Sequence, residues 1–185
     1  MKRLFAASLL VFVCICASAQ SIVGSHSFEI GGGINLFGLI ASHGGPDREL
    51  GPGVFFEYRY AFAEHFDVGG QLNFKCGKGH PEEMGLGFQT SEFFDNQVAL
   101  KAVADYNICP SRLASPYIGI GAGTGYMFSK LLENNQINHY PYGIVGGRIG
   151  IQVWRFRIAL ECDFALKHGL SSEETSTALN LSFTF

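Results

Sequence analysis

The residues of this sequence that could carry catalytic chemistry gather around one histidine near the C-terminus. His168 is followed by Ser171 and Ser172, and then by Glu173 and Glu174. A serine, an imidazole base and an orienting carboxylate that lie within hydrogen-bond reach can perform nucleophilic acyl chemistry. The spacing alone does not bring these three groups together, and connecting segments are ordinarily rich in the same residue types. We therefore expect no catalytic residues, and keep an enzyme as the alternative.

Histidines spread along the chain suggest a second kind of site, a divalent-metal centre. Imidazole nitrogens suit zinc or copper, but His43, His80, His139 and His168 match no compact metal-binding spacing. The glycine-rich run at 119–125 does not fit the G-x-G-x-x-G pattern of a dinucleotide-binding loop, and no helix is predicted after it. The sequence therefore predicts neither a metal site nor a bound cofactor.

Charged residues alternate with apolar ones, most clearly over residues 154–167, which read W-R-F-R-I-A-L-E-C-D-F-A-L-K. A period of two predicts a β-strand with one apolar and one charged face. These fourteen residues exceed the usual strand of about 5–6 residues. A strand that crosses a bilayer needs roughly 9–11 residues. The apolar face must therefore meet either a protein core or lipid.

Residues 1–19 have the form of a secretory signal peptide. Two basic residues open it, an apolar run covers 4–15, and small residues at 17–19 predict cleavage before Gln20. The apolar run is shorter than the ~20 residues of a helical span, which argues against an uncleaved anchor. The mature chain, 20–185, would carry 11 basic and 16 acidic side chains, a formal net charge of −5. This charge argues against a nucleic-acid partner.

Three cysteines remain in the expected mature chain, Cys76, Cys109 and Cys162. An odd number is awkward for a disulfide framework in a secreted protein. We interpret them as small apolar side chains without a disulfide bridge.

Eight stretches show the alternation expected of strands, and the connections between them alternate in length. The predicted strands are 26–37, 53–62, 65–76, 93–108, 117–128, 140–151, 154–167 and 175–185. The longer connections, roughly 39–52, 77–91, 129–139 and 168–174, follow every second strand. All four would therefore lie at one end of the molecule, which is typical of outer-membrane barrels.

Two architectures could use these strands, a soluble sandwich with an apolar core or a membrane barrel with a polar interior. The polar faces favour the barrel because their charges balance, and buried charges are costly unless they are paired. The acids are Glu29, Glu57, Asp67, Asp95, Asp105, Glu161 and Asp163, and the bases are Arg59, Lys75, Lys101, Arg148, Arg155, Arg157 and Lys167.

Aromatic and glycine residues also favour the barrel. Aromatic side chains collect at strand ends, as in the two interfacial belts of a membrane protein. One predicted belt, at the short-turn end, contains Phe28, Tyr60, Phe62, Phe66, Tyr106, Trp154, Phe183 and Phe185; the other contains Phe74, Phe94, Tyr126, Phe128 and Phe164. Gly119, Gly121, Gly123 and Gly125 give one strand a bare inner face, which leaves room for long arginines in a narrow barrel.

The chain resembles the small outer-membrane β-barrels of Gram-negative bacteria, the porin-family or outer-membrane β-barrel-domain proteins with an OmpX- or OmpA-barrel-like layout. The glycine-rich stretch P-Y-I-G-I-G-A-G-T-G-Y at 116–126 resembles their strands. The pattern at 179–185, ending in Phe185, resembles the C-terminal signal that barrel-assembly machinery reads. The resemblance covers 26–185. It implies an all-β fold, an eight-stranded antiparallel up-and-down transmembrane β-barrel with short periplasmic turns and longer extracellular loops, in the cell outer membrane.

The expected function is that of a non-enzymatic outer-membrane barrel with a charge-paired, largely plugged interior and surface loops for interaction or adhesion. The expected partners are outer-membrane lipids, the barrel-assembly machinery through the strand ending in Phe185, and an extracellular ligand at the loops. One alternative is an outer-membrane lipid-modifying enzyme, an acyl hydrolase or acyltransferase with a site near the outer rim. Another is a gated ion path through rearranged charge pairs.

Overall fold

The computed structural model of the chain describes residues 23–37, 47–48, 50–80, 93–109, 114–131, 137–166 and 174–185. The expected signal peptide at 1–19 and most of the expected long connections lie outside these residues. No described residue belongs to a helix that has the length and apolar character of a membrane span.

The described residues form one antiparallel sheet of nine strands, eight long ones and one of two residues. The strands are β1 (His26–Phe37), β2 (Asp47–Arg48), β3 (Gly51–Ala63), β4 (Phe66–His80), β5 (Phe93–Asn107), β6 (Ala114–Leu131), β7 (Ile137–Val153), β8 (Phe156–Leu166) and β9 (Glu174–Thr184). The short strand β2 pairs only with the end of β4, where Asp47 lies opposite His80.

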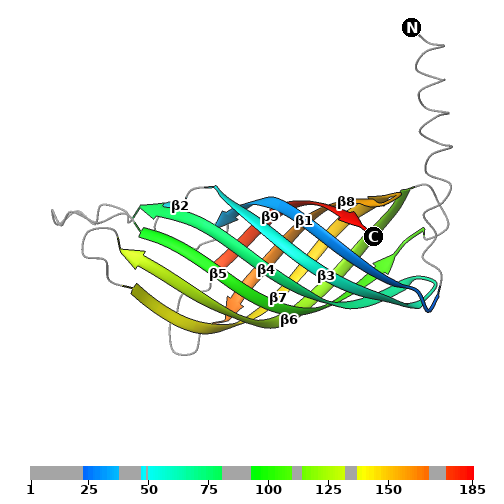
Figure 1. Cartoon of the computed structure of the whole chain (residues 1–185), viewed down its shortest axis with the longest axis horizontal. Coiled ribbons are helices and arrows are strands. Elements are labelled where there is room, and N and C mark those ends of the chain that lie inside the picture. Colours follow the sequence, from blue (N-terminus) through cyan, green and yellow to red (C-terminus); the bar gives the residue numbers. More distant parts are fainter. Residues whose placement is uncertain are drawn as a thin grey trace, which may run out of the picture.

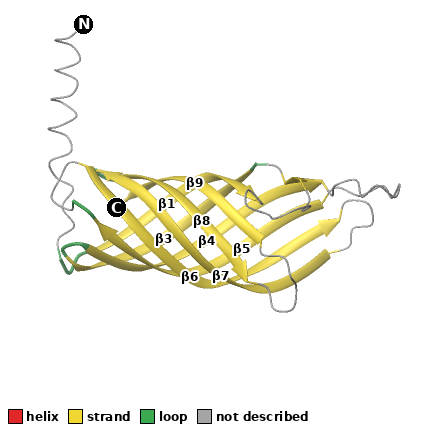
Figure 2. Ribbon diagram, turned by 180° about the vertical axis from the view of Figure 1, so that it is seen from behind, coloured by secondary structure: helices red, strands yellow, loops and turns green. Residues whose placement is uncertain are grey.

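The eight long strands close into an up-and-down barrel. Each pairs with its neighbours along the chain, β4 pairs with β5, and the first strand β1 pairs with the last strand β9. Figures 1 and 2 show the strands winding obliquely around one axis, with the described tight turns at one end. We call this the short-turn end, and the opposite end the long-loop end. The predicted eight-stranded antiparallel barrel is confirmed.

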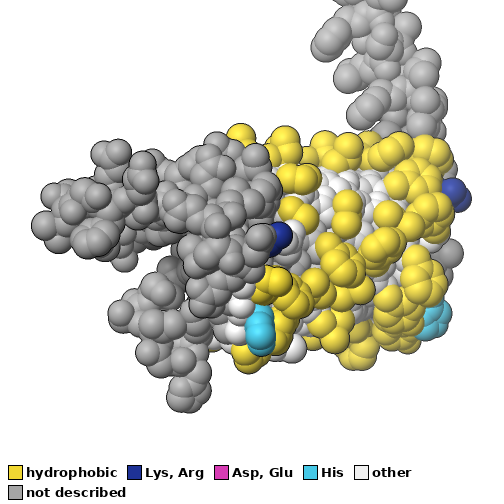
Figure 3. All heavy atoms as spheres, turned by 60° about the vertical axis from the view of Figure 1, so that its left-hand side comes forward, with side chains coloured by type: hydrophobic (Ala, Val, Ile, Leu, Met, Phe, Trp, Pro, Cys, Tyr) yellow, Lys and Arg dark blue, Asp and Glu magenta, His cyan; other side chains and the backbone are white. Residues whose placement is uncertain are grey.

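The alternation along each strand separates an apolar outer wall from a polar interior. In β8, Phe156, Ile158 and Leu160 are exposed, whereas Arg157 and Ala159 between them and Glu161 after them are buried. A space-filling view shows hydrophobic side chains over the visible wall, with lysine, arginine and histidine only towards the two ends (Figure 3). An apolar exterior of this extent around an ionic interior is the reverse of a soluble sandwich.

The strand predicted over 154–167 is too long at its start. Trp154 and Arg155 form the tight turn between β7 and β8, and Trp154 has a φ of 58°. Both residues are exposed at the short-turn end, so Arg155 is not one of the interior charges, as the alternation had predicted. The period-two pattern continues through the turn by coincidence, because no glycine, proline or asparagine marks the reversal.

The strands reach further towards the long-loop end than the sequence predicted. β6 continues to Leu131 and β7 begins at Ile137, so most of the loop expected at 129–139 is strand. β4 likewise extends to His80, into the loop expected at 77–91. These extensions are held by backbone hydrogen bonds between neighbouring strands and are not marked by alternating side chains. Ser129 pairs with Asn138, and Lys130 pairs with Ile137.

Most of the described aromatic side chains on the outer wall lie towards its two ends, as predicted. At the short-turn end the Phe156, Phe183 and Phe185 rings form a continuous edge-to-face series, with centroids 5.2 and 5.1 Å apart. At the long-loop end the Tyr126 ring lies 4.9 Å from Phe128. Edge-to-face pairs of this kind stabilise one another beyond the apolar area they cover.

Candidate functional site in the barrel interior

Three acids and three arginines form a neutral cluster in the short-turn half of the lumen, which we call the inner cluster. Its members come from five strands, with Glu29 on β1, Glu57 and Arg59 on β3, Asp105 on β5, Arg148 on β7 and Arg157 on β8. All six side chains are buried, and Arg157 and Asp105 each keep only 1% of their surface exposed. Strict alternation places each of these residues on the inner face.

Arg148 is the centre of the inner cluster because it binds two carboxylates at once. Its guanidinium donates to both oxygens of Glu57 at 2.7 and 2.9 Å, and to both oxygens of Asp105 at 2.7 and 2.8 Å. Arg59 pairs with Glu57 at 2.5 Å and with Glu29 at 2.9 Å. Two-pronged arginine–carboxylate pairs of this geometry are among the strongest polar contacts in proteins.

Arg157 completes the inner cluster and also packs on an aromatic ring. It lies 2.9 Å from Asp105 and 3.4 Å from Glu29, and its guanidinium carbon is 3.7 Å from the centroid of Tyr117. The Ser182 hydroxyl donates to Glu29 from β9. The Glu29 carboxylate on β1 is therefore hydrogen-bonded to β9, the strand that closes the barrel against β1.

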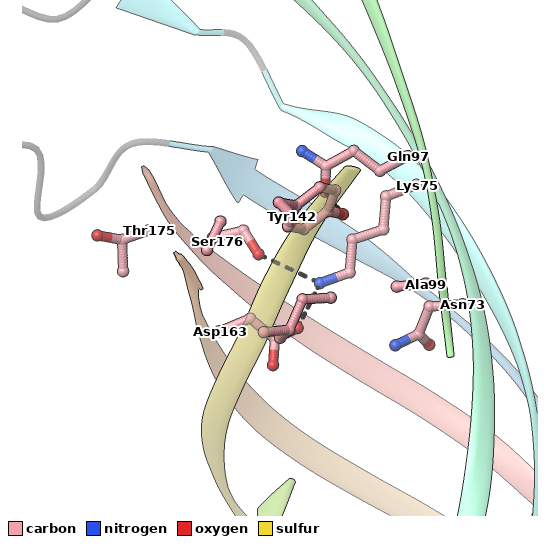
Figure 4. Close-up of a pocket in the computed structure, with 10 residues that line it drawn as sticks. Asn73, Lys75, Gln97, Ala99, Tyr142, Asp163, Thr175 and Ser176 are labelled. Atoms are coloured by element: carbon pink, nitrogen blue, oxygen red, sulfur yellow. Dashed lines mark hydrogen bonds and ion pairs between the residues drawn. The ribbon is translucent and has the colours of Figure 1, made fainter. Parts of the chain in front are cut away.

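A second neutral group, the outer cluster, lies nearer the long-loop end. It consists of Lys75, Lys101, Glu161 and Asp163. Lys75 donates to Asp163 at 2.9 Å and to Ser176 at 3.2 Å, and these contacts are drawn in Figure 4. Lys101 binds Glu161 and lies 3.1 Å from both oxygens of Asp163.

Amide side chains extend the inner cluster along the inner face of β4, in the direction of the outer cluster. Gln71 donates to Glu57 at 2.8 Å, and Asn73 donates to Gln71 at 3.0 Å. Below the inner cluster, Asn107 donates to Asp67 at 2.8 Å. The described interior is thus a nearly continuous polar network along the barrel axis.

The sequence predicted seven acids and seven bases in the interior, and the structure places most of them there. The five buried bases are Arg59, Lys75, Lys101, Arg148 and Arg157, and the six buried acids are Glu29, Glu57, Asp67, Asp105, Glu161 and Asp163. Arg155 is the exception, because it lies in a turn. Lys167 and the side chain of Asp95 lie outside what the structure describes. The principle of paired interior charges holds for both clusters.

The interior also contains an apolar component that the side-chain alternation did not predict. Ala99, Met127, Tyr142 and Ile144 form a small buried cluster, and three of them line the same cavity as Lys75 and Asp163. Tyr142 also covers Gly125, where a Cβ atom would lie 2.5 Å from the Tyr142 ring. On the opposite half, the Tyr117 ring covers Gly150 in the same way, at 2.6 Å. The glycines therefore make room for aromatic rings as well as for arginine.

The space that remains between these groups is small. A cavity of about 20 Å³ lies beside Lys75, Gln97, Tyr142 and Asp163 (Figure 4). Another of about 10 Å³ lies between the two clusters, against Arg148 and Lys101. One water molecule needs roughly 10–15 Å³ measured in this way, so each holds about one water.

The alternative catalytic and metal sites weighed from the sequence are not formed by the residues that the structure describes. His168, Ser171 and Ser172 lie outside them, as do His43 and the side chain of His80. His139 is on the outer face of β7, where its ring stacks on Tyr126 at 5.9 Å. Among the described residues no three histidine, cysteine, aspartate or glutamate side chains are grouped to hold a metal ion. Cys76, Cys109 and Cys162 are unpaired.

A family model provides the deciding comparison, because the model described as outer membrane protein beta-barrel domain matches residues 7–177. The chain belongs to this family. An eight-stranded barrel with an apolar wall and this family membership is an outer-membrane protein of the Gram-negative type. Its short-turn end is periplasmic and its long-loop end is extracellular. A search of curated protein sequences found no match.

Solved structures of outer-membrane proteins share the fold at low sequence identity. Ail, the attachment invasion locus protein of Yersinia pestis, is 18% identical with a TM-score of 0.52, and the match covers 89% of this chain and all of Ail. OprG of Pseudomonas aeruginosa is 11% identical with a TM-score of 0.57, covering 88% and 97%. Neisserial surface protein A is 10% identical with a TM-score of 0.58, covering 86% and 95%. At these identities the comparisons support the fold alone.

Proposed function

We propose that this barrel is a non-enzymatic outer-membrane protein whose interior is largely closed to solutes and whose extracellular loops interact with a ligand or a surface. The observation that carries the proposal is a pair of ionic contacts across the full width of the lumen. Arg148 on β7 reaches Glu57 on β3, and Lys75 on β4 reaches Asp163 on β8. In the ring of eight strands, β7 lies opposite β3 and β4 lies opposite β8.

The dimensions of the barrel support the same conclusion. Eight strands enclose a lumen that side chains can fill, whereas aqueous channels occur in barrels of about 16 or more strands. The cavities beside Lys75 and between the clusters each hold about one water and are separated by ion pairs. A solute would have to break several buried charge pairs to pass, which is costly because each separated ion would lose its partner.

Current recordings across a planar lipid bilayer test the closed interior. We expect the purified barrel to give no large, stable single-channel conductance. A double substitution, Arg148→Ser with Glu57→Ser, removes one contact across the lumen without changing net charge, and should open small conductance steps. A large, stable conductance of the unsubstituted barrel, equal to that of the double variant, would refute the closed interior.

The loop function rests on topology and on one structural relative. The four longer connections all emerge at the extracellular end, beyond a rigid barrel, and binding residues are commonly placed on such loops. The related Ail structure has also been solved with the heparin analogue sucrose octasulfate. We therefore include a surface ligand in the proposal, with a sulfated polysaccharide as the first probe.

Loop replacement in living cells tests this part of the proposal. Each connection, at 38–46, 81–92, 132–136 and 167–173, is replaced in turn by a short glycine–serine turn. We expect at least one replacement to abolish binding of the expressing cells to immobilised heparin and to epithelial cells, at unchanged surface abundance. Equal binding by all four variants and by cells that lack the barrel would exclude a loop-borne adhesive function.

The proposal also covers the partner needed for biogenesis. The outward residues Leu179, Leu181, Phe183 and Phe185 form an apolar row on β9, the strand that closes the barrel against β1. A strand with an apolar row and an open edge can add to another sheet edge before closure. We propose that the barrel-assembly machinery binds this strand.

A further inference from the structure

The periplasmic mouth of the barrel contains a cavity that the closed interior does not explain. It has a volume of about 170 Å³ and lies below the inner cluster. Arg59 and Asp67 line its inner part, Thr184 lines one side, and Trp154 and Arg155 lie at its rim. At the roughly 10–15 Å³ that one water needs when measured in this way, the cavity has room for on the order of ten water molecules, so a small molecule or the end group of a larger one fits inside.

The turn at the rim is held in an unfavourable backbone conformation. Trp154 is the one non-glycine residue with positive φ in the described part of the chain, and its φ is 58°. Glycine or asparagine ordinarily occupies this region, and a bulky residue there is strained. Gln152 donates to the Trp154 carbonyl oxygen at 3.2 Å and fixes the turn. Strained turns of this kind cluster at ligand-binding sites.

The strained turn presents a cation to the cavity. No ion pair links Arg155 to any residue that the structure describes, and its guanidinium carbon lies 5.6 Å from the Trp154 ring centroid. The other two charged side chains that line the cavity already have partners, since Arg59 pairs with Glu29 and Glu57, and Asp67 accepts a hydrogen bond from Asn107. Arg155 therefore supplies the available charge at the mouth.

An unsatisfied hydroxyl belongs to a residue that lines the same cavity. The Thr184 Oγ1 atom is buried and has no hydrogen-bond partner among the described residues. Buried hydroxyls without a partner are uncommon, because each loses its bonds to water. A ligand that accepts a hydrogen bond would satisfy it.

We infer that the periplasmic mouth binds an oxyanion, a carboxylate or phosphate group carried by a small periplasmic molecule. The planar guanidinium of Arg155 can donate two parallel hydrogen bonds to such a group. The Thr184 hydroxyl donates a third, and Trp154 lies at the rim of the cavity. The site is separate from the extracellular loops and does not depend on their function.

Tryptophan fluorescence tests this site directly, because Trp154 is the only tryptophan in the sequence. The chain, refolded in an uncharged detergent, is titrated with sodium succinate, sodium phosphate and uncharged sucrose, with sodium chloride keeping the ionic strength constant. We expect a saturable change in emission with succinate, phosphate or both, and none with sucrose. A response to succinate alone assigns a carboxylate ligand, and a response to phosphate alone assigns a phosphate ligand.

Two matched variants assign the response to the cavity. Arg155→Gln should weaken binding about tenfold or more, because it removes the charge-assisted pair. Lys130→Gln removes the same charge from an exposed position at the extracellular end and should leave the affinity unchanged. The inference is overturned if neither anion gives a saturable change, if Arg155→Gln binds as tightly as the unsubstituted chain, or if both variants lose affinity equally.

Discussion

Replacing Arg148 by methionine should lower the free energy of unfolding by about 3–5 kcal/mol, the usual cost of removing one partner from a buried ion pair. The substitution removes four hydrogen bonds and leaves Glu57 and Asp105 without their shared counter-ion. Folded proteins are commonly stable by about 5–15 kcal/mol, so this loss is a large share of the total. Urea-induced unfolding in lipid vesicles, followed by the mobility of folded and unfolded forms on unheated gels, measures it.

Arg155→Met is the matched control for this prediction. It makes the same chemical change at an exposed turn residue that has no ion-pair partner among the described residues. Surface substitutions of this kind have small effects on stability. If Arg148→Met and Arg155→Met unfolded at the same urea concentration, the inner cluster would not stabilise the barrel.

Replacing Ile120 by arginine should lower the free energy of unfolding in a bilayer by about 2–4 kcal/mol, the cost of a charge on the lipid face near the membrane midplane. Ile120 lies near the middle of β6 and keeps 69% of its surface exposed. In a soluble protein, an isoleucine so exposed would tolerate arginine, because the charge would remain in water. The same vesicle unfolding experiment measures the difference.

Ile137→Arg provides the control because it repeats the same change at a different depth. Ile137 is also exposed, but it begins β7 at the extracellular end, where an arginine can reach the headgroups. We expect its effect to be about 0–1 kcal/mol. Equal effects at the two positions would mean that the wall around Ile120 does not face hydrocarbon.

The fold could be predicted from the sequence because a membrane barrel has a simple side-chain period. Alternation in stretches such as 156–166 assigns each residue to the wall or to the lumen, and the structure agrees for the charges of both clusters. The turn at Trp154 and Arg155 escaped prediction because neither residue type ordinarily forms one. The apolar residues Tyr142 and Ile144 were missed because the glycines around them interrupt the alternation.

The partners inside the lumen could not be predicted from one sequence. Arg148 binds Glu57, ninety-one positions away, and this contact depends on how far neighbouring strands are offset around the barrel. The same offset places Tyr117 over Gly150. A composition count reveals that the charges can neutralise one another, but it contains no information on which strands oppose each other.

The carboxylate shared by Arg59, Arg157 and Ser182 constrains how the protein is made. Glu29 belongs to the first strand β1, its counter-ions Arg59 and Arg157 come from β3 and β8, and Ser182 lies on the last strand β9. Until β9 has paired with β1, Glu29 must stay hydrated or remain outside the hydrocarbon. Pairing of β9 with β1 and dehydration of the lumen are thus one cooperative event. An incomplete sheet in the bilayer would expose the unpaired Glu29 carboxylate to hydrocarbon.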